Sequence, residues 1–149
     1  MAKKGADIRS PDDFPAPTEG FVASFFLTVA DVERSVAFYS DVLGAKVIKP
    51  RDPAVLRLAN TWLLMNPGGG PTPDKPDITL APPTDPNRSG AFLNLRVADV
   101  AAVHRDWSAR GANFLTPPIE RPGEVRCYLR DPDGYLIEVG QTTLEEITE

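Results

Sequence analysis

The chain has few of the residues that build disulfides and metal sites: a single cysteine, Cys127, and a single histidine, His104, among 149 residues. One cysteine excludes an intrachain disulfide and fits a reducing compartment. No apolar run approaches the roughly 18 to 20 residues that span a bilayer. Lys3 and Lys4 are not followed by the apolar core of a signal peptide. The sequence therefore predicts a cytoplasmic protein without a membrane partner.

Positive charge is also scarce, because 16 Lys and Arg stand against 21 Asp and Glu, a formal net charge of −5. Nucleic acids and anionic membranes select clustered Lys and Arg, so neither is an expected partner. Apolar residues make up 42% and charged residues 25% of the chain. These fractions are typical of a soluble globular protein, and the length allows one domain with its own core.

The chain does contain a short internal sequence repeat. The sequence Val-Ala-Asp-Val occurs at residues 29–32 and again at 97–100. In each copy the aspartate, Asp31 or Asp99, is suited to capping a helix, because its carboxylate can accept hydrogen bonds from free backbone N–H groups. Apolar residues follow at helical spacing, and Gly44 or Gly111 then stands where a helix commonly ends.

Segments rich in β-branched and aromatic residues surround the two predicted helices. The predicted strands are residues 22–29, 45–48, 54–58, 61–65, 91–97, 113–115, 124–130 and 135–139. Residues 77–81 could be a further strand or the continuation of the preceding one. Each half of the chain thus predicts a βαβββ module, over residues 21–84 and 90–141. An irregular arm, residues 1–20, precedes them as a flexible tail or a contact to a partner subunit, and a tail follows at 142–149.

Three stretches resemble the vicinal oxygen chelate superfamily, which includes glyoxalase I, extradiol dioxygenases, and bleomycin- and fosfomycin-resistance proteins. They are residues 27–39 (LTVADVERSVAFY), Leu43-Gly44, and residues 130–138 (RDPDGYLIE). The resemblance covers residues 21–141. It implies an α+β fold in which two tandem βαβββ modules form curled mixed sheets around a shared cleft. It also implies a homodimer.

In metal enzymes of this superfamily, His, Gln and Glu side chains supply four ligands to a divalent ion, from the first strand and a late strand of each module. Seven residues before each capping aspartate stand Ser24 and Phe92, and the late strand of the first module places its position near residues 79–81. Only Glu138, in the late strand of the second module, matches a ligand type. A serine hydroxyl is a poor ligand and a phenyl ring is none, so the sequence predicts no metal and no other cofactor.

Strand alternation places Ser24 and Phe26 on one strand face, and Phe92 and Asn94 on the corresponding face of the second copy. The predicted ligand-binding residues are Ser24, Phe26, Trp62, Phe92, Asn94, Cys127 and Glu138. Trp62 could form a stacking wall for a ligand. Cys127 pairs across from Glu138 if the intervening turn has four residues; its alternative role is that of a small buried apolar residue.

Glu138 leaves three interpretations open: a residual metal ligand, a catalytic acid or base, or a carboxylate paired with Arg126 or Arg96. His104 lies in the second predicted helix, away from any clustered ligands, and is expected to be a solvated or flanking residue of that helix.

The favoured function is metal-free binding and sequestration of a small aromatic or amphipathic molecule in the cleft, as in bleomycin resistance. One alternative is a divalent-metal-dependent lyase, isomerase or dioxygenase with atypical ligands. The other is a metal-free enzyme that uses Glu138 as acid or base. Whether the protein is an enzyme is left open, because fold does not fix function.

Overall fold

The computed structural model describes residues 12–143; part of the predicted arm (1–11) and most of the predicted tail (144–149) lie outside the described residues. Residues 12–23 contain turns and bends but no helix or strand. The chain divides into two compact units that meet between Pro82 and Pro83. Each unit contains one mixed β-sheet and one α-helix, so the fold is α+β.

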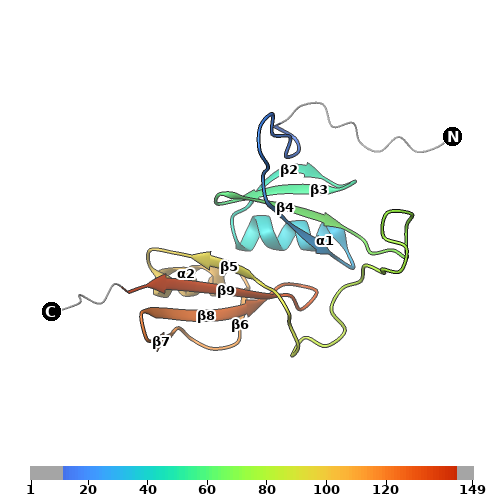
Figure 1. Cartoon of the computed structure of the whole chain (residues 1–149). Helices are drawn as coiled ribbons and strands as arrows, with labels where there is room; N and C mark the ends of the chain where they lie inside the picture. Colours follow the sequence, from blue (N-terminus) through green and yellow to red (C-terminus); the bar gives the residue numbers. More distant parts are fainter. Residues whose placement is uncertain (1–11, 144–149) are drawn as a thin grey trace. The chain divides into compact units, whose positions relative to one another are not determined.

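The first unit is a βαβββ module. Its elements are β1 (Ser24–Thr28), α1 (Val32–Ala37), the π-helical turn η1 (Phe38–Val42), β2 (Lys46–Pro50), β3 (Ala54–Leu58) and β4 (Thr61–Asn66). The sheet order is β1-β4-β3-β2, with β1 parallel to β4 and the other pairs antiparallel. Figure 1 shows α1 lying against one face of this sheet. The largest fully buried side chains of the unit include Tyr39, Leu27, Leu56, Leu63 and Met65.

The helix of the first unit begins as the sequence predicts, since the Asp31 carboxylate accepts a hydrogen bond from the Arg34 N–H at 3.1 Å. It does not continue as one α-helix. The last five residues form the wider π-helical turn, which still buries Tyr39 and ends before Gly44. Gly44 adopts φ +79°, a left-handed conformation that costs glycine little.

The second unit repeats the arrangement with its second strand divided in two. Its elements are β5 (Leu93–Arg96), α2 (Val100–Ala109), β6 (Asn113–Phe114), β7 (Ile119–Arg121), β8 (Glu124–Arg130) and β9 (Leu136–Thr142). The sheet order is β5-β9-β8-β6, with β7 also pairing with β8 and β5 parallel to β9. Strand β7 is not among the predicted strands, and β9 extends into the segment predicted as a tail.

The second helix confirms its predicted cap, because the Asp99 carboxylate accepts from the Ala102 N–H at 3.0 Å. Gly111 follows the helix with φ +100°. His104 lies within α2, and its ring centroid is 4.5 Å from that of Phe114.

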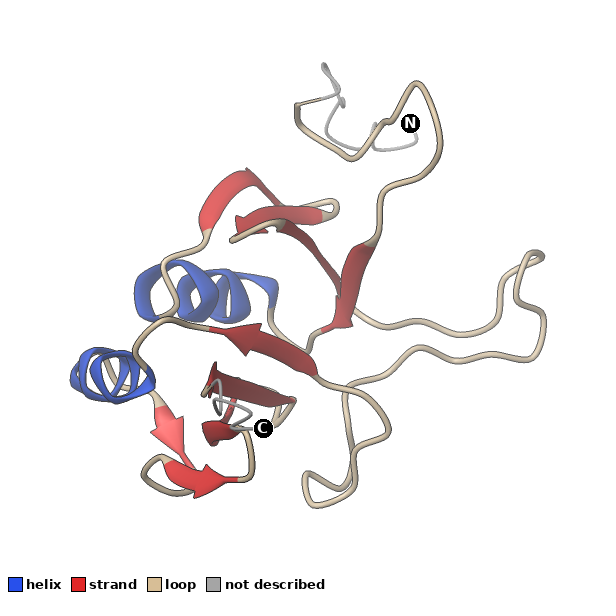
Figure 2. Cartoon of the chain, turned by 60° about the vertical axis from the view of Figure 1, so that its left-hand side comes forward, coloured by secondary structure: helices blue, strands red, loops and turns tan. Residues whose placement is uncertain are grey.

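The segment between β4 and β5 forms no strand, and Figure 2 shows it as a long loop. The prediction of a strand at residues 77–81 is wrong: only an isolated bridge forms there, between Gly69 and Leu80. The neighbouring Gly68 lets the backbone of Leu80 come this close, because a Cβ at residue 68 would lie 2.1 Å from the Leu80 carbonyl oxygen. Among the described residues, no helix is long and apolar enough to cross a membrane.

The β8–β9 hairpin closes through five residues, not four. The Asp131 carboxylate accepts hydrogen bonds from the N–H groups of Asp133 and Tyr135, each at 2.9 Å, and thereby holds the longer turn. Tyr128 consequently pairs with Glu138, and Cys127 pairs with Val139. The predicted pairing of Cys127 with Glu138 is wrong, because one extra turn residue shifts the register and moves Cys127 to the opposite face.

Candidate functional site

The two sheets can be compared position by position through their parallel strand pairs. In the second unit Asn94 of β5 pairs with Glu138 of β9. The Val-Ala-Asp-Val repeat places Asn94 in register with Phe26 of β1, and Phe26 pairs with Leu64 of β4. Leu64 is therefore the first-unit counterpart of Glu138. The sequence-based placement of that position near residues 79–81 is wrong, because the insertion after β4 lies outside the sheet.

Glu138 is a buried carboxylate that has partners in its own sheet. Its side chain is 5% exposed, and its Oε2 accepts a hydrogen bond from the Asn94 amide at 2.5 Å. Its Oε1 lies 4.0 Å from the Nε of Arg126. The interpretation of Glu138 as a carboxylate near an arginine therefore matches the structure for Arg126 but not for Arg96, whose recorded ion pair is with Glu124.

Arg96 reaches Glu124 by crossing β9 at Gly140. Its Nη2 lies 3.2 Å from the Glu124 carboxylate and 3.0 Å from the Thr142 hydroxyl. A Cβ on Gly140 would lie 2.2 Å from the Arg96 guanidinium, so the missing side chain creates the space for this crossing. Glycine at this position thus permits a charge contact between β5 and β8, the two strands that flank β9.

Glu124 lies between two arginines. The Arg126 guanidinium donates a hydrogen bond to it at 2.9 Å, and Arg96 approaches it from the other side. The hydrogen bond from Arg126, with the charges of both arginines, holds the pKa of Glu124 below its usual value. The same hydrogen bond raises the pKa of Arg126. This part of the sheet therefore carries fixed opposite charges at neutral pH.

Two aromatic rings border the charged side chains. Phe92 meets Tyr128 edge to face, with ring centroids 5.9 Å apart, and the Arg126 guanidinium lies 5.8 Å from the Tyr128 ring. Tyr128 is absent from the residues that the sequence predicts for the site. Counting the hairpin turn as four residues paired Cys127 with Glu138 and left Tyr128 out; an Asp at the start of the turn is the signal for the longer closure.

The first unit presents different chemistry on its corresponding face. Ser24 and Phe26, which the alternation places on one face of the strand, are both exposed. Trp62, which pairs with Ser24, is half-buried, and the guanidinium of Arg57 lies 4.4 Å from its ring centroid. The Trp62 ring, which could stack on a ligand, is thus already covered by the Arg57 guanidinium.

Cys127 lies in the core of the second unit at 1% exposure. Burial raises the pKa of its thiol to about 11, so the side chain is protonated at neutral pH and is a poor nucleophile. Its position agrees with the small buried apolar residue that the sequence offers as the second interpretation. Its side chain lies on the other face of the sheet from those of Tyr128 and Glu138.

Four positions carry the metal ligands in the metal enzymes of the vicinal oxygen chelate superfamily, and the residues at these four family positions do not fit a divalent metal ion. They are Ser24 and Leu64 in the first unit, and Phe92 and Glu138 in the second. One carboxylate cannot replace the His, Gln and Glu set that such a site requires. Nor do the described residues contain any group of three or more His, Cys, Asp or Glu side chains able to hold a metal ion.

Residues 21–139 match the family described as the Glyoxalase/Bleomycin resistance protein/Dioxygenase superfamily. The chain is 27% identical to lactoylglutathione lyase GLX1 of Arabidopsis thaliana, over 76% of this chain and 41% of that protein. It is 26% identical to the lactoylglutathione lyase of Salmonella typhimurium, over 76% and 86% of the two chains. It thus spans about two fifths of the plant relative's length and most of the bacterial one's.

A further relative is the metallothiol transferase FosB of Shouchella clausii, 28% identical over 80% of this chain and 78% of that protein. Among solved structures, a glyoxalase/bleomycin resistance protein/dioxygenase from Nocardioides superposes with a TM-score of 0.70 at 19% identity, over 91% and 90% of the two chains. TnmS3 from Streptomyces, an antibiotic binding protein, superposes with a TM-score of 0.61 at 22% identity, over 86% and 100%. At these identities the structural likeness shows the fold alone.

Proposed function

Because the chain belongs to the Glyoxalase/Bleomycin resistance protein/Dioxygenase superfamily, we propose that it binds a small aromatic or amphipathic molecule without a metal ion. The observation that carries the proposal is the residue set at the four family positions, where three side chains have no ligating group suited to a divalent ion. The fourth, Glu138, is engaged by the Asn94 amide.

The face of the second sheet offers the contacts that such a molecule needs. Phe92 and Tyr128 supply aromatic surface, and Phe92 is 40% exposed. Asn94 and Glu138 add a donor and an acceptor beside the rings. Ligand sites commonly combine an apolar lining with a few placed polar groups of this kind. TnmS3 is an antibiotic binding protein, and its name supports binding as one use of this fold.

A second candidate is a divalent-metal-dependent lyase or transferase that uses a different ligand set. The names of the relatives favour it, because they include lactoylglutathione lyases and a metallothiol transferase. A third is a metal-free enzyme in which Glu138 moves a proton. Its buried position beside Asn94 and Tyr128 supports this role.

Metal content separates the first candidate from the second. We expect the purified protein to contain no stoichiometric Ni, Zn, Mn or Fe by elemental analysis, and calorimetric titration with each ion to show no tight binding. The fluorescent aromatic probe 8-anilinonaphthalene-1-sulfonate should bind equally well before and after EDTA treatment. One tightly held ion per chain that is lost in Glu138→Gln would overturn the proposal, as would metal-dependent turnover of S-lactoylglutathione.

Substitution of Glu138 separates binding from acid–base catalysis. Glu138→Gln keeps the shape and a hydrogen-bonding group, so binding of the probe should change less than about threefold. Any turnover that depended on Glu138 as acid or base would fall by about 100-fold or more in the same variant. Phe92→Ser is the matched variant that should weaken the probe, because it removes aromatic contact surface.

A further inference from the structure

A cavity lies along strand β8, next to the Glu138 position. It has a volume of about 220 Å³. Its lining residues are Leu115, Thr116, Ile119, Arg121, Arg126 and Tyr128, with Cys127 between the last two. The sheet register sets the arrangement: Ile119 pairs with Arg126, Arg121 pairs with Glu124, and the Leu115 N–H bonds to the Tyr128 carbonyl oxygen. Because Tyr128 also pairs with Glu138, the cavity is on the Glu138 face of the sheet.

The apolar side of the cavity is uncovered. Leu115 and Ile119 are 48% and 49% exposed, although both are large aliphatic side chains. Tyr128 adds a ring between them and Phe92. Exposed apolar side chains gathered in a concave site are the usual lining for the apolar body of a ligand. The small volume favours a ligand with one ring or a short branched chain.

The charged residues that line the cavity are both cations, Arg121 and Arg126. With their neighbours Arg96, Glu124 and Glu138 they make three guanidinium groups against two carboxylates. Arg126 already meets both carboxylates. The backbone of Arg121 pairs with Glu124 in the sheet, but the Arg121 guanidinium has no hydrogen bond or ion pair with any residue in the described range 12–143. This local positive excess contrasts with the net charge of −5 for the whole chain.

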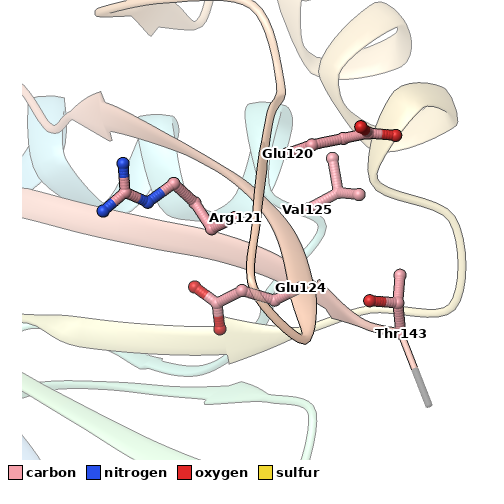
Figure 3. Close-up of a pocket in the computed structure, with 5 residues that line it drawn as sticks. All are labelled: Glu120, Arg121, Glu124, Val125 and Thr143. Carbon is pink, nitrogen blue, oxygen red and sulfur yellow. The ribbon is translucent and has the colours of Figure 1, made fainter. Parts of the chain in front are cut away.

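The Arg121 side chain lies on the face of the sheet that carries the cavity. Figure 3 shows Arg121 and Glu124 extending to one side of the β7–β8 hairpin, whereas Glu120, Val125 and Thr143 extend to the other. The guanidinium is therefore on the side of the sheet that carries Arg126 and Tyr128, as the pairing of Arg121 with Glu124 requires. A guanidinium presents a planar fork of N–H donors that matches a carboxylate.

We infer that this cavity binds a small organic monocarboxylate, with the carboxylate on Arg121 and the apolar body on Leu115, Ile119 and Tyr128. A cationic ligand would be repelled by Arg121. The second negative charge of a dianionic ligand would have no cation to pair with. The inference rests on the proposed function, in which the protein binds a small molecule, and it names the chemical class of that molecule. Arg121 is then the residue that determines specificity for the anion.

The test uses benzoate as the probe and benzamide as its uncharged counterpart. Both are titrated into the isotope-labelled full chain, and amide chemical shifts are followed by NMR. We expect benzoate to shift resonances of Leu115, Ile119, Arg121 and Tyr128, and to bind about 3- to 10-fold more tightly than benzamide. Arg121→Gln should remove this preference, whereas Arg121→Lys should keep part of it.

Two variants serve as controls. Arg105→Gln removes an equal charge from helix α2, where Arg105 is 72% exposed, and should leave both affinities unchanged. Ile119→Ser should weaken benzoate and benzamide alike, because both share the apolar contact. Equal affinity for the two probes, or an unchanged preference in Arg121→Gln, would overturn the inference.

These outcomes are distinguishable from failure of the proposed function. A tight metal ion that depends on Glu138 would refute metal-free binding, yet the benzoate preference would still depend on Arg121. Conversely, loss of the preference for benzoate with no metal bound would refute only the carboxylate assignment.

Discussion

The two βαβββ units share one backbone plan but place opposite chemistry at matching positions. Where the first sheet pairs Phe26 with Leu64, the second pairs Asn94 with Glu138. Leu64 is 8% exposed and Glu138 is 4% exposed, so both positions are buried. The duplication thus fixes the location and burial of a position without fixing its polarity. A buried carboxylate can occupy this position only where an amide and a guanidinium lie beside it.

The largest expected effect comes from making the first unit resemble the second. Leu64→Glu would bury a carboxylate whose strand partners are Phe26 and Val55, with no donor at either position. We expect the free energy of unfolding to fall by about 3 kcal/mol or more, measured by urea denaturation. Leu64→Met conserves the volume and should cost about 1 kcal/mol or less. If Leu64→Glu lowers the free energy of unfolding by less than about 1 kcal/mol, the environments of residues 64 and 138 do not differ.

Making the second unit resemble the first should lower the free energy of unfolding by less, because it removes a charge from the interior. Glu138→Leu alone leaves the Asn94 amide without its partner and should cost about 1–3 kcal/mol. Adding Asn94→Phe recreates the Phe26–Leu64 pair, so the double variant should be more stable than the sum of the two single changes predicts. Urea denaturation of all four proteins gives the coupling free energy, expected to be about 1 kcal/mol. Strict additivity would contradict a direct interaction.

A smaller effect is expected at the glycine that lets Arg96 cross the sheet. Gly140→Ala should displace the guanidinium from Glu124 and Thr142 and lower stability by about 1 kcal/mol. The cost should almost vanish when Arg96 is already Gln, since the added methyl then meets no guanidinium. If Gly140→Ala costs the same in both backgrounds, the glycine is needed for a reason other than Arg96.

The smallest effect concerns the charges themselves. The pKa of Glu124 is lowered in the folded protein, so ionised Glu124 favours folding above its unfolded pKa. That contribution is lost as the pH falls through the folded pKa. An NMR titration of the Glu124 carboxyl should give a pKa below the model-peptide value, and Arg126→Gln should raise it. An unchanged pKa in Arg126→Gln would assign the shift to Arg96 instead.

Much of the fold follows from the sequence because the repeat carries strong local signals. Asp31 and Asp99 cap helices, and Gly44 and Gly111 follow helix ends, because each role depends on neighbouring residues only. The site is harder to predict, because it depends on cross-strand register. A single uncounted residue in the β8–β9 turn placed Cys127, not Tyr128, beside Glu138.

The contacts around Glu138 could not be predicted for a similar reason. The arrangement in which Arg96 reaches Glu124 over Gly140 joins three strands, and no local pattern reports it. Arg121 was likewise missed, because the short strand β7 follows two prolines that suggest a break in structure. Local signals thus identified the scaffold, whereas the charged side chains were located only by the register between strands.

The five-residue turn held by Asp131 also bears on how this protein can vary in length. Side chains alternate along β8 and β9, so the pairing that the turn closes sets which residues share a face with Glu138. A one-residue slip of β8 along β9 would turn Arg126 and Tyr128 toward the core and Cys127 and Leu129 toward water. A two-residue slip would keep each side chain on its face. A longer or shorter turn is therefore compatible with this sheet only if it still closes the pairing of Tyr128 with Glu138.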